Sequence, residues 1–171
     1  MAENVRGAIV ARKPATPRVL VLNGPNLNML GVRDPAVYGT ATLAEIEALC
    51  AARAATLGLA LDFRQTNSEG TLIDWVQAAR GSAAGIVINP AGLSHSSVSL
   101  LDALLLTELP VIEVHLSNIH RREPFRHHSY VSQVATGVIA GLGPRGYGLA
   151  LEAMAGLLAA REKATEKGTV R

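Results

Sequence analysis

Lysine is missing from the central part of this 171-residue chain. The three lysines, Lys13, Lys163 and Lys167, lie near its two ends, and none occurs between Pro14 and Glu162. A covalent Schiff base with a carbonyl substrate requires a lysine amine. The sequence therefore excludes covalent amine catalysis from the folded core.

Cysteine, aromatic residues and long apolar runs are also scarce. Cys50 is the only cysteine, which excludes an intrachain disulfide and is typical of a small core residue in a reducing compartment. The chain has one Trp, three Tyr and two Phe, too few for a platform that stacks nucleic-acid bases. The net charge is only +2, and the arginines are interleaved with acids, so no basic stripe emerges.

Neither a membrane span nor a secretion signal is visible in the sequence. No apolar run is long enough to cross a bilayer. Residues 1–17 lack the apolar core of a signal peptide and contain Pro14 and Pro17. We therefore expect a cytoplasmic protein that binds neither nucleic acid nor membrane.

The residues that are present predict one α/β domain. Apolar residues make up 49% of the chain and charged residues 18%, as in a globular domain with a proper core. Short apolar runs alternate with amphipathic segments, the runs at 18–22, 59–65, 85–89, 111–117 and 136–140 and the segments at 42–57, 71–80, 98–108 and 145–161. Strands that alternate with helices pair in parallel through right-handed crossovers.

Five such units predict a flavodoxin-like three-layer sandwich whose parallel strands have the order 2-1-3-4-5. We expect residues 1–17 to form a flexible N-terminal arm, 18–161 a single α/β domain, and 162–171 a flexible C-terminal tail. In such sheets, ligands bind beyond the carboxyl ends of the strands, where the strand order reverses. Three polar motifs stand at those ends: NGPNLNMLG, NPAGLSHSS and HLSN.

The histidines and several arginines are clustered in one stretch of the sequence. Its members are His95, His115, His120, His127 and His128, together with Arg121, Arg122 and Arg126. Imidazoles titrate near neutral pH, and guanidinium groups bind anions. The cluster favours acid–base chemistry on a small, oxygen-rich anion.

The loop after the first strand and the segment that follows it carry three candidates. The Asn26 amide can hold a water or an enolate oxygen, although Asn, Gly and Pro also dominate ordinary turns. Arg33 and Tyr38 lie in a polar connection that is long enough to act as a lid. A neighbouring guanidinium lowers the pKa of a phenol, so Tyr38 could accept a proton. The alternative is a solvent-facing arginine and an anchoring tyrosine.

Polar residues beyond the third and fourth strands supply further candidates. Asn89 ends a buried strand, and His95 stands among serines before a helix, where it could bond a substrate hydroxyl or merely accompany serine caps. Glu113, His115 and Ser117 alternate, so they share one face of a strand. We expect Glu113 to orient and charge His115 as a proton donor; the alternative is a structural Glu–His pair, which is costly to bury.

Two arginines and one aspartate complete the candidates. Arg122 and Arg126 are four residues apart, so a helical turn would place them side by side to bind a carboxylate or polyol; the alternative is a solvated turn. Asp102 lies in an apolar helical stretch, where a buried carboxylate needs a partner, such as a neighbouring subunit. We expect no metal site, because the sequence has neither HExxH nor a Cys–His set.

Seven motifs in register resemble the signatures of the type II 3-dehydroquinate dehydratases, over about residues 18–160. They are NGPNLNMLG, RDPAVYG, QTNSEG, NPAGLSHSS, IEVHLSN, HRREPFRHHSY and ATGVIAGLGPRGY. The resemblance implies a flavodoxin-like lyase of the shikimate pathway that converts 3-dehydroquinate to 3-dehydroshikimate without metal or organic cofactor. It also implies a homododecamer built as four trimers.

The resemblance also implies a role for each candidate. Tyr38 matches the base that takes the proton beside the ketone, and Arg33 the arginine that activates it. Asn26 matches the residue that holds the water facing the enolate, His115 matches the general acid, and Glu113 matches its orienting carboxylate. The contacts to the substrate carboxylate and ring correspond to Asn89, Leu116 and Ser117, and the contacts to its hydroxyls correspond to His95 and Arg126. Asp102 matches a residue that reaches a neighbouring subunit's site, and Arg122 matches an arginine near the tyrosine.

Three alternative functions are compatible with the same fold. One is a flavodoxin-like module that binds flavin or takes part in phosphoryl signalling. A receiver domain would need an acidic pair after the first strand and a lysine after the fifth, where this sequence has Asn26 and Gly141–Gly143. A second alternative is an assembly protein without turnover, but the presence of Tyr38, Arg33 and His115 argues against it. A third is the same dehydration used in quinate catabolism.

Overall fold

The computed structural model describes residues 16–32 and 40–168, and these contain a five-stranded parallel sheet. Its strands are β1 (Arg18–Asn23), β2 (Ala60–Gln65), β3 (Gly85–Asn89), β4 (Val111–His115) and β5 (Gly137–Ala140). The strand order is β2-β1-β3-β4-β5, with every neighbouring pair parallel. The predicted flavodoxin-like sheet is confirmed.

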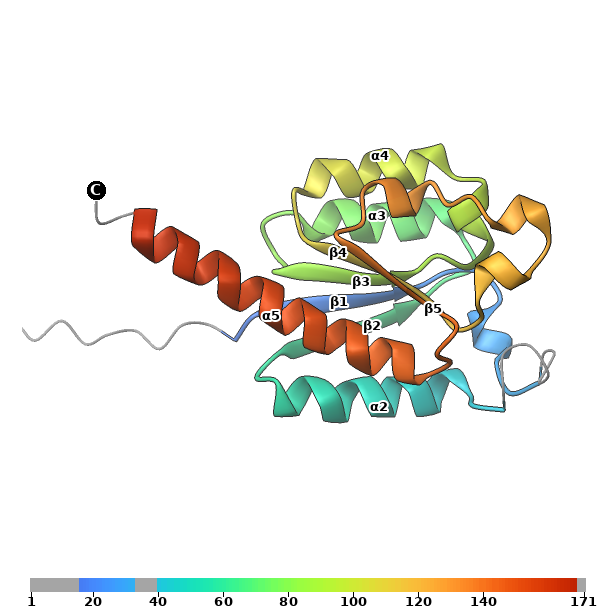
Figure 1. Ribbon diagram of the computed structural model, residues 1–171, viewed down its shortest axis with the longest axis horizontal. Coiled ribbons are helices and arrows are strands. Elements are labelled where there is room, and N and C mark those ends of the chain that lie inside the picture. The colour runs from blue at the N-terminus through green and yellow to red at the C-terminus, as the bar shows by residue number, and fades with distance from the viewer. Residues whose placement is uncertain (1–15, 33–39, 169–171) are drawn as a thin grey trace, which may run out of the picture.

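Four longer helices cover the two faces of this sheet. They are α2 (Leu43–Thr56), α3 (Glu69–Ala79), α4 (Val98–Thr107) and α5 (Arg145–Gly168). Figure 1 shows α2 and α5 on one face and α3 and α4 on the other. Strand β1 lies inside the sheet and contributes to both apolar layers, with Val19 and Val21 on the α2/α5 side and Leu20 and Leu22 on the α3/α4 side. This burial on both faces explains why β1 is a continuous apolar run.

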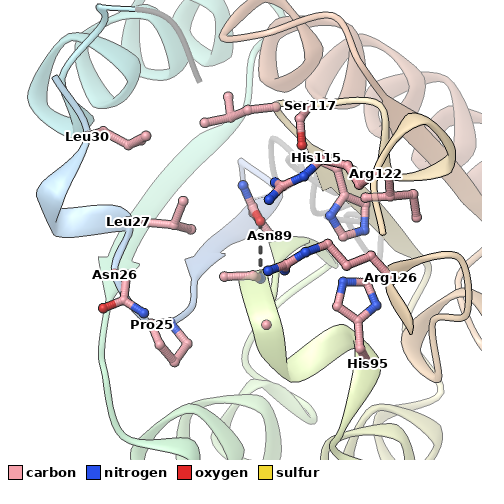
Figure 2. Close-up of a pocket in the computed structure, with 14 residues that line it drawn as sticks. Pro25, Asn26, Leu27, Leu30, Asn89, His95, His115, Ser117, Arg122 and Arg126 are labelled. Carbon is pink, nitrogen blue, oxygen red and sulfur yellow. Dashed lines mark hydrogen bonds between the residues drawn. The ribbon is translucent and has the colours of Figure 1, made fainter. Parts of the chain in front are cut away.

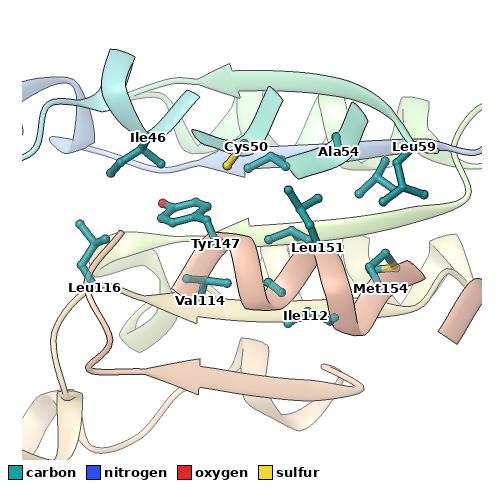
Figure 3. Packing of buried hydrophobic residues seen from close by; sticks show 14 of the residues in the cluster. Ile46, Cys50, Ala54, Leu59, Ile112, Val114, Leu116, Tyr147, Leu151 and Met154 are labelled. Atoms are coloured by element: carbon teal, nitrogen blue, oxygen red, sulfur yellow. The ribbon is translucent and has the colours of Figure 1, made fainter. Parts of the chain in front are cut away.

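The layer between α2, α5 and the sheet is closely packed around side chains of α5. Figure 3 shows Tyr147, Leu151 and Met154 of α5 directed toward α2 and the strands. Cys50 of α2 is fully buried there, and burial raises the pKa of its thiol to about 12. Cys50 is therefore an inert core residue, as the sequence predicted.

The helix ends follow local sequence signals, with one difference at the C-terminus. Thr42 caps α2 and exchanges hydrogen bonds with Glu45, and together they form a capping box. Helix α5 continues through Gly168, seven residues beyond the end predicted for it. Residues 162–167 are mostly Glu, Lys and Ala, which favour helix even where no core is available. The predicted N-terminal arm lies almost wholly outside the described residues.

A buried chain of hydrogen bonds connects α5 to the carboxyl ends of β1 and β3. The Tyr147 hydroxyl donates to Asn23 Oδ1 at 2.6 Å and accepts from Asn89 Nδ2 at 2.9 Å. Asn23 Nδ2 donates to the Arg64 carbonyl at 3.0 Å, and Asn89 Oδ1 accepts from the Ala91 N–H at 3.2 Å. Each amide has one accepting oxygen and one donating nitrogen, so the chain fixes the orientation of both.

The phenol of Tyr147 determines which group donates and which accepts in this series of hydrogen bonds. Burial raises the pKa of Tyr147, so its hydroxyl stays protonated and continues to donate to Asn23. It must then accept from Asn89, whose amide keeps one further N–H for other partners. The fold therefore presents Asn89 as a donor at the end of β3.

Gly24, just beyond β1, lies against the backbone that follows β3. Its N–H donates to the Asn89 carbonyl at 2.8 Å. A Cβ at position 24 would stand 2.7 Å from the Pro90 carbonyl carbon and still nearer its oxygen. A backbone carbonyl cannot swing aside as a side chain does, so the close approach of the two loops requires glycine.

We expect Gly24→Ala to lower the free energy of unfolding by about 1–3 kcal/mol, because the added methyl overpacks the backbone. Urea unfolding at one fixed protein concentration measures this change. Gly156→Ala is the matched control, since a Cβ there meets nothing within 4 Å and Ala is preferred to Gly within a helix. Equal stability of the two variants would contradict the close approach.

We expect Tyr147→Phe to lower the free energy of unfolding by about 1–3 kcal/mol, because it leaves buried amide groups of Asn23 and Asn89 without a partner. Tyr130→Phe serves as control, because it removes the hydroxyl of a partly exposed tyrosine. Thermal and urea unfolding of both variants test this expectation. A stability loss for Tyr130→Phe as large as that for Tyr147→Phe would refute it.

Candidate active site

A pocket opens at the carboxyl ends of β1, β3 and β4, where the sequence placed the ligand site (Figure 2). It brings together these predicted residues: Asn26, Asn89, His95, His115, Leu116, Ser117, Arg122 and Arg126. Leu27, Leu30 and Ile119 line the same pocket and give it an apolar part. The pocket therefore combines imidazoles, guanidinium groups and amides with a shielded wall.

His115 is held by a carboxylate that is completely buried. Its Nε2 lies 2.7 Å from Glu113 Oε1, and Glu113 has no exposed surface. Burial raises the pKa of the Glu113 carboxyl, but hydrogen bonds from His115, Ser132 and Ser129 and the charge of His115 outweigh it, so the pKa is lowered. The ionised carboxylate accepts from Nε2–H, which leaves Nδ1 as the ring nitrogen available to a ligand.

His95 is held through its other ring nitrogen, Nδ1. Its Nδ1 lies 2.7 Å from the carbonyl oxygen of His128. A carbonyl can only accept, so Nδ1 carries the hydrogen and Nε2 carries the lone pair. Burial lowers the pKa of His95, as do the charges of His115 and Arg126, which keeps the ring neutral near pH 7. His95 can therefore accept a hydrogen bond from a hydroxyl.

The two imidazoles lie close together. Their ring centroids are 6.4 Å apart and their planes differ by 14°. His95 reaches the pocket from the short 3-10 helix after β3, and His115 from the end of β4 (Figure 2). One neutral ring and one ring paired with a carboxylate thus face the same space, an arrangement suited to distinct acceptor and donor roles.

The two arginines of the pocket are not in one helical turn, contrary to the prediction from their spacing. Short 3-10 helices cover Ile119–Arg121 and Pro124–Arg126, with extended backbone at Arg122 between them. Glu123 instead connects the arginines, because its Oε2 lies 2.9 Å from Arg126 Nε and 3.5 Å from Arg122 Nε. Both guanidinium groups still line the pocket and can attract an anion.

Asn26 combines a turn position with a place at the pocket. Its backbone has φ of 67°, which asparagine adopts more readily than most residues. Its N–H donates to Asn67 Oδ1 at 2.9 Å, while its side chain lines the pocket (Figure 2). The turn interpretation and the ligand interpretation of Asn26 are therefore compatible.

Three predicted residues are not among those that line the described pocket. Arg33 and Tyr38 fall outside the described residues. Asp102 is exposed on α4 rather than buried, and it does not line the pocket of its own subunit. The prediction of a buried carboxylate was wrong because Asp102 occupies the outer face of a helix whose inner face carries Leu100 and Ala103.

Sequence reasoning missed four residues that support the site from behind. Asn23 and Tyr147 orient Asn89, and Ser129 and Ser132 donate to Glu113. In residues 16–32 and 40–168, no group of three His, Cys, Asp or Glu side chains is placed to hold a metal ion. No helix in the same ranges has the length and apolar character needed to cross a membrane.

Comparison with known proteins identifies the family. The model of the family "Dehydroquinase class II" matches residues 17–155. The chain is 66% identical over 137 residues to 3-dehydroquinate dehydratase 2 of Pseudomonas aeruginosa, covering 80% of this chain and 93% of that relative. It is 57% identical over 150 residues to 3-dehydroquinate dehydratase of Streptomyces coelicolor, covering 87% and 96%.

A solved structure agrees with this assignment. The type II dehydroquinase of Propionibacterium acnes superposes with a TM-score of 0.78 at 48% identity, covering 81% of this chain and 95% of the other. The sheet order, the pocket beyond its carboxyl ends and the family match all agree. The chain belongs to the class II dehydroquinase family.

Proposed function

We propose that this protein is a type II 3-dehydroquinate dehydratase, which eliminates water from 3-dehydroquinate to give 3-dehydroshikimate. The observation that carries the proposal is the pair of imidazoles, His95 held through Nδ1 and His115 held through Nε2, in a pocket with two arginines. The family match and the names of the relatives support the same reaction.

Elimination beta to a ketone has three chemical requirements: a base for the alpha proton, stabilisation of the enolate, and an acid for the departing hydroxyl. We assign the base to Tyr38, activated by Arg33. Asn26, at the rim of the pocket, holds the water that faces the enolate oxygen. No redox change occurs and no amine is needed, which fits a core without lysine. The proposal therefore includes no cofactor and no metal.

His115 is the proposed general acid. The charge of Glu113 favours the imidazolium, and the bond to Nε2 leaves Nδ1–H to protonate the hydroxyl as it leaves. A protonated imidazole makes water the leaving group in place of hydroxide, which lowers the barrier.

The remaining pocket residues bind and orient the substrate. Asn89 offers its free amide N–H, and Leu116 and Ser117 offer backbone N–H groups, to the substrate carboxylate. The neutral Nε2 of His95 and the guanidinium of Arg126 bind the ring hydroxyls. Arg122 also lines the pocket and adds positive charge there, and we assign it the role of a further arginine that assists Tyr38.

We place the reaction in the shikimate pathway, in the cytoplasm, on the way to chorismate and the aromatic amino acids. Quinate catabolism uses the same dehydration and is the alternative. Aromatic auxotrophy of a strain that lacks this protein supports the biosynthetic role, and loss of growth on quinate alone supports the catabolic one.

We expect the purified protein to convert 3-dehydroquinate to an ultraviolet-absorbing conjugated enone, and Tyr38→Phe to lower kcat by at least about a hundredfold, since the phenol is the base. KM should change only a few-fold, because the phenol acts in the transition state. Tyr130→Phe is the matched control and should keep near-normal turnover. Substantial kcat in Tyr38→Phe would remove that residue from the role of base.

The same assay separates this mechanism from others. EDTA should leave the rate unchanged, because no step uses a metal. Borohydride added with substrate should also leave the enzyme active, because no imine forms. Inactivation through a trapped amine adduct, or a yellow purified protein that binds flavin without turnover, would overturn the proposed function.

We further propose that the protein assembles as a dodecamer of four trimers, and that α4 contacts a neighbouring subunit. Its outer face carries Val98, Leu105 and Leu106, which are 49%, 57% and 59% exposed in the single chain. Asp102 stands on the same face, at helical spacing from these residues. An exposed apolar stripe of this kind is typical of a subunit interface, and in such an interface Asp102 would reach the neighbour's pocket.

We expect Asp102→Ala and His115→Ala each to be nearly inactive, and their co-expressed mixture to regain turnover. The gain arises because a mixed assembly contains sites with His115 from one subunit and Asp102 from the other. Affinity tags of two kinds isolate the mixed assemblies, and sedimentation checks that each single variant still assembles. Mixed assemblies as inactive as the two single variants would rule out the contribution across subunits.

A further inference from the structure

The buried carboxylate of Glu113 has more hydrogen-bond donors than His115 alone. Ser129 Oγ donates to Oε1 at 2.7 Å, on the same oxygen as His115 Nε2. Ser132 Oγ donates to the other oxygen, Oε2. Both oxygens of a carboxylate that water cannot reach are thereby satisfied from one segment of chain.

The two serines belong to a segment that the fold holds in place from several sides. The Tyr130 N–H donates to the Ser94 carbonyl at 2.8 Å, and Val131 between the serines is fully buried. The Ser132 N–H donates to Ser129 Oγ at 3.2 Å. The hydroxyls are therefore preorganised toward Glu113, and they need no rearrangement when charge develops nearby.

A buried Glu–His pair can place its proton on either partner. With hydrogen bonds to both oxygens, the carboxylate is stabilised as an anion and the proton stays on the imidazole. Without them, the anion loses the compensation for its burial, and the neutral pair with a carboxylic acid becomes favoured. A His115 that has given its Nε2 proton to Glu113 keeps the Nδ1–H, but a neutral imidazole is a far weaker acid than an imidazolium and would protonate a leaving group much less readily.

We infer that Ser129 and Ser132 are positioning residues that keep the proton on His115 rather than on Glu113. This inference rests on the proposed role of His115 as the acid. Among the described residues, the other charged or titratable groups that line the pocket with His115 are His95, Arg122 and Arg126, from the elements after β3 and β4. The two arginines are positively charged and His95 is neutral, so within this set Glu113, held by its two serines, supplies the negative charge that pairs with the His115 ring.

Ser132→Ala tests the inference with little disturbance to the fold. Ser132 is partly exposed, and its N–H keeps the bond to Ser129 in the variant. We expect kcat to fall about ten- to a hundredfold, the range for loss of one hydrogen bond to a charged group, with KM within about twofold. Ser132→Thr keeps the hydroxyl and should stay within about threefold of the parent enzyme. A Ser132→Ala enzyme with normal kcat would overturn the inference.

A double-mutant cycle shows whether the serine acts through Glu113. In a Glu113→Gln background the carboxylate charge is gone, so adding Ser132→Ala should change kcat by less than about twofold. A serine that merely stiffened its own segment would cost the same factor in both backgrounds. An equal loss in both backgrounds would therefore refute the inference.

Infrared spectroscopy locates the proton without reference to turnover. The Ser129→Ala/Ser132→Ala enzyme should show the carbonyl band of a protonated glutamic acid, and Glu113→Gln should abolish that band. A spectrum without the band would contradict the inference, even if both variants proved poorly active. Absence of dehydration by the parent enzyme would instead refute the proposed function, and the spectra would still decide where the proton lies.

Discussion

The carboxylate of Glu113 is a full negative charge placed on an inner strand, with no exposed surface. Moving such a group out of water costs several kcal/mol unless hydrogen bonds and an opposite charge compensate. The compensation comes from His115, two residues along the same strand, and from serines of the segment that folds back beside β4. The path of the chain from β4 to β5 is thus tied to the same charge that orients the His115 imidazole.

The part of the pocket at the ends of β1 and β3 also depends on hydrogen bonds between buried groups, which the register of the sheet brings together. Asn23 and Asn89 are opposite each other in the last register position of β1 and β3. Two amides side by side at the end of a buried sheet need partners, and one phenol from α5 serves both. Packing of α5 against the sheet therefore fixes which amide hydrogen of Asn89 faces the pocket. The same hydrogen bonds thus stabilise the fold and orient a group that can bind a ligand.

The sequence predicted the sheet, its order and the position of the site because these depend on local patterns. Apolar runs, a capping box and polar motifs at strand ends are each visible within a few residues. The supporting bonds were not predictable in this way. Ser129 and Ser132 contact a residue 16 and 19 positions earlier, and Tyr147 contacts one 58 positions earlier. Nothing in the local sequence distinguishes such a serine or tyrosine from a surface residue.

The errors have equally physical causes. The spacing of Arg122 and Arg126 favoured a helical turn, but Pro124 disfavours helical backbone at the residue before it and starts a new 3-10 helix. The guanidinium groups converge through Glu123 instead. Asp102 was expected to be buried because its neighbours are apolar, although part of that apolar surface faces outward in the single chain.

The two imidazoles of the pocket are held through different ring nitrogens, so one residue type can perform two tasks within a single pocket. A carbonyl fixes the hydrogen of His95 on Nδ1, and a carboxylate fixes that of His115 on Nε2. The carbonyl belongs to His128 and two of the donors to the carboxylate are Ser129 and Ser132, so one short segment controls both rings. The rings, whose centroids are 6.4 Å apart, present different nitrogens to the pocket because different groups bind the other nitrogen of each ring. Displacement of that segment would loosen the bonds that hold both rings, so the arrangement of the pocket depends on the chain after β4 as much as on the strand ends that carry the rings.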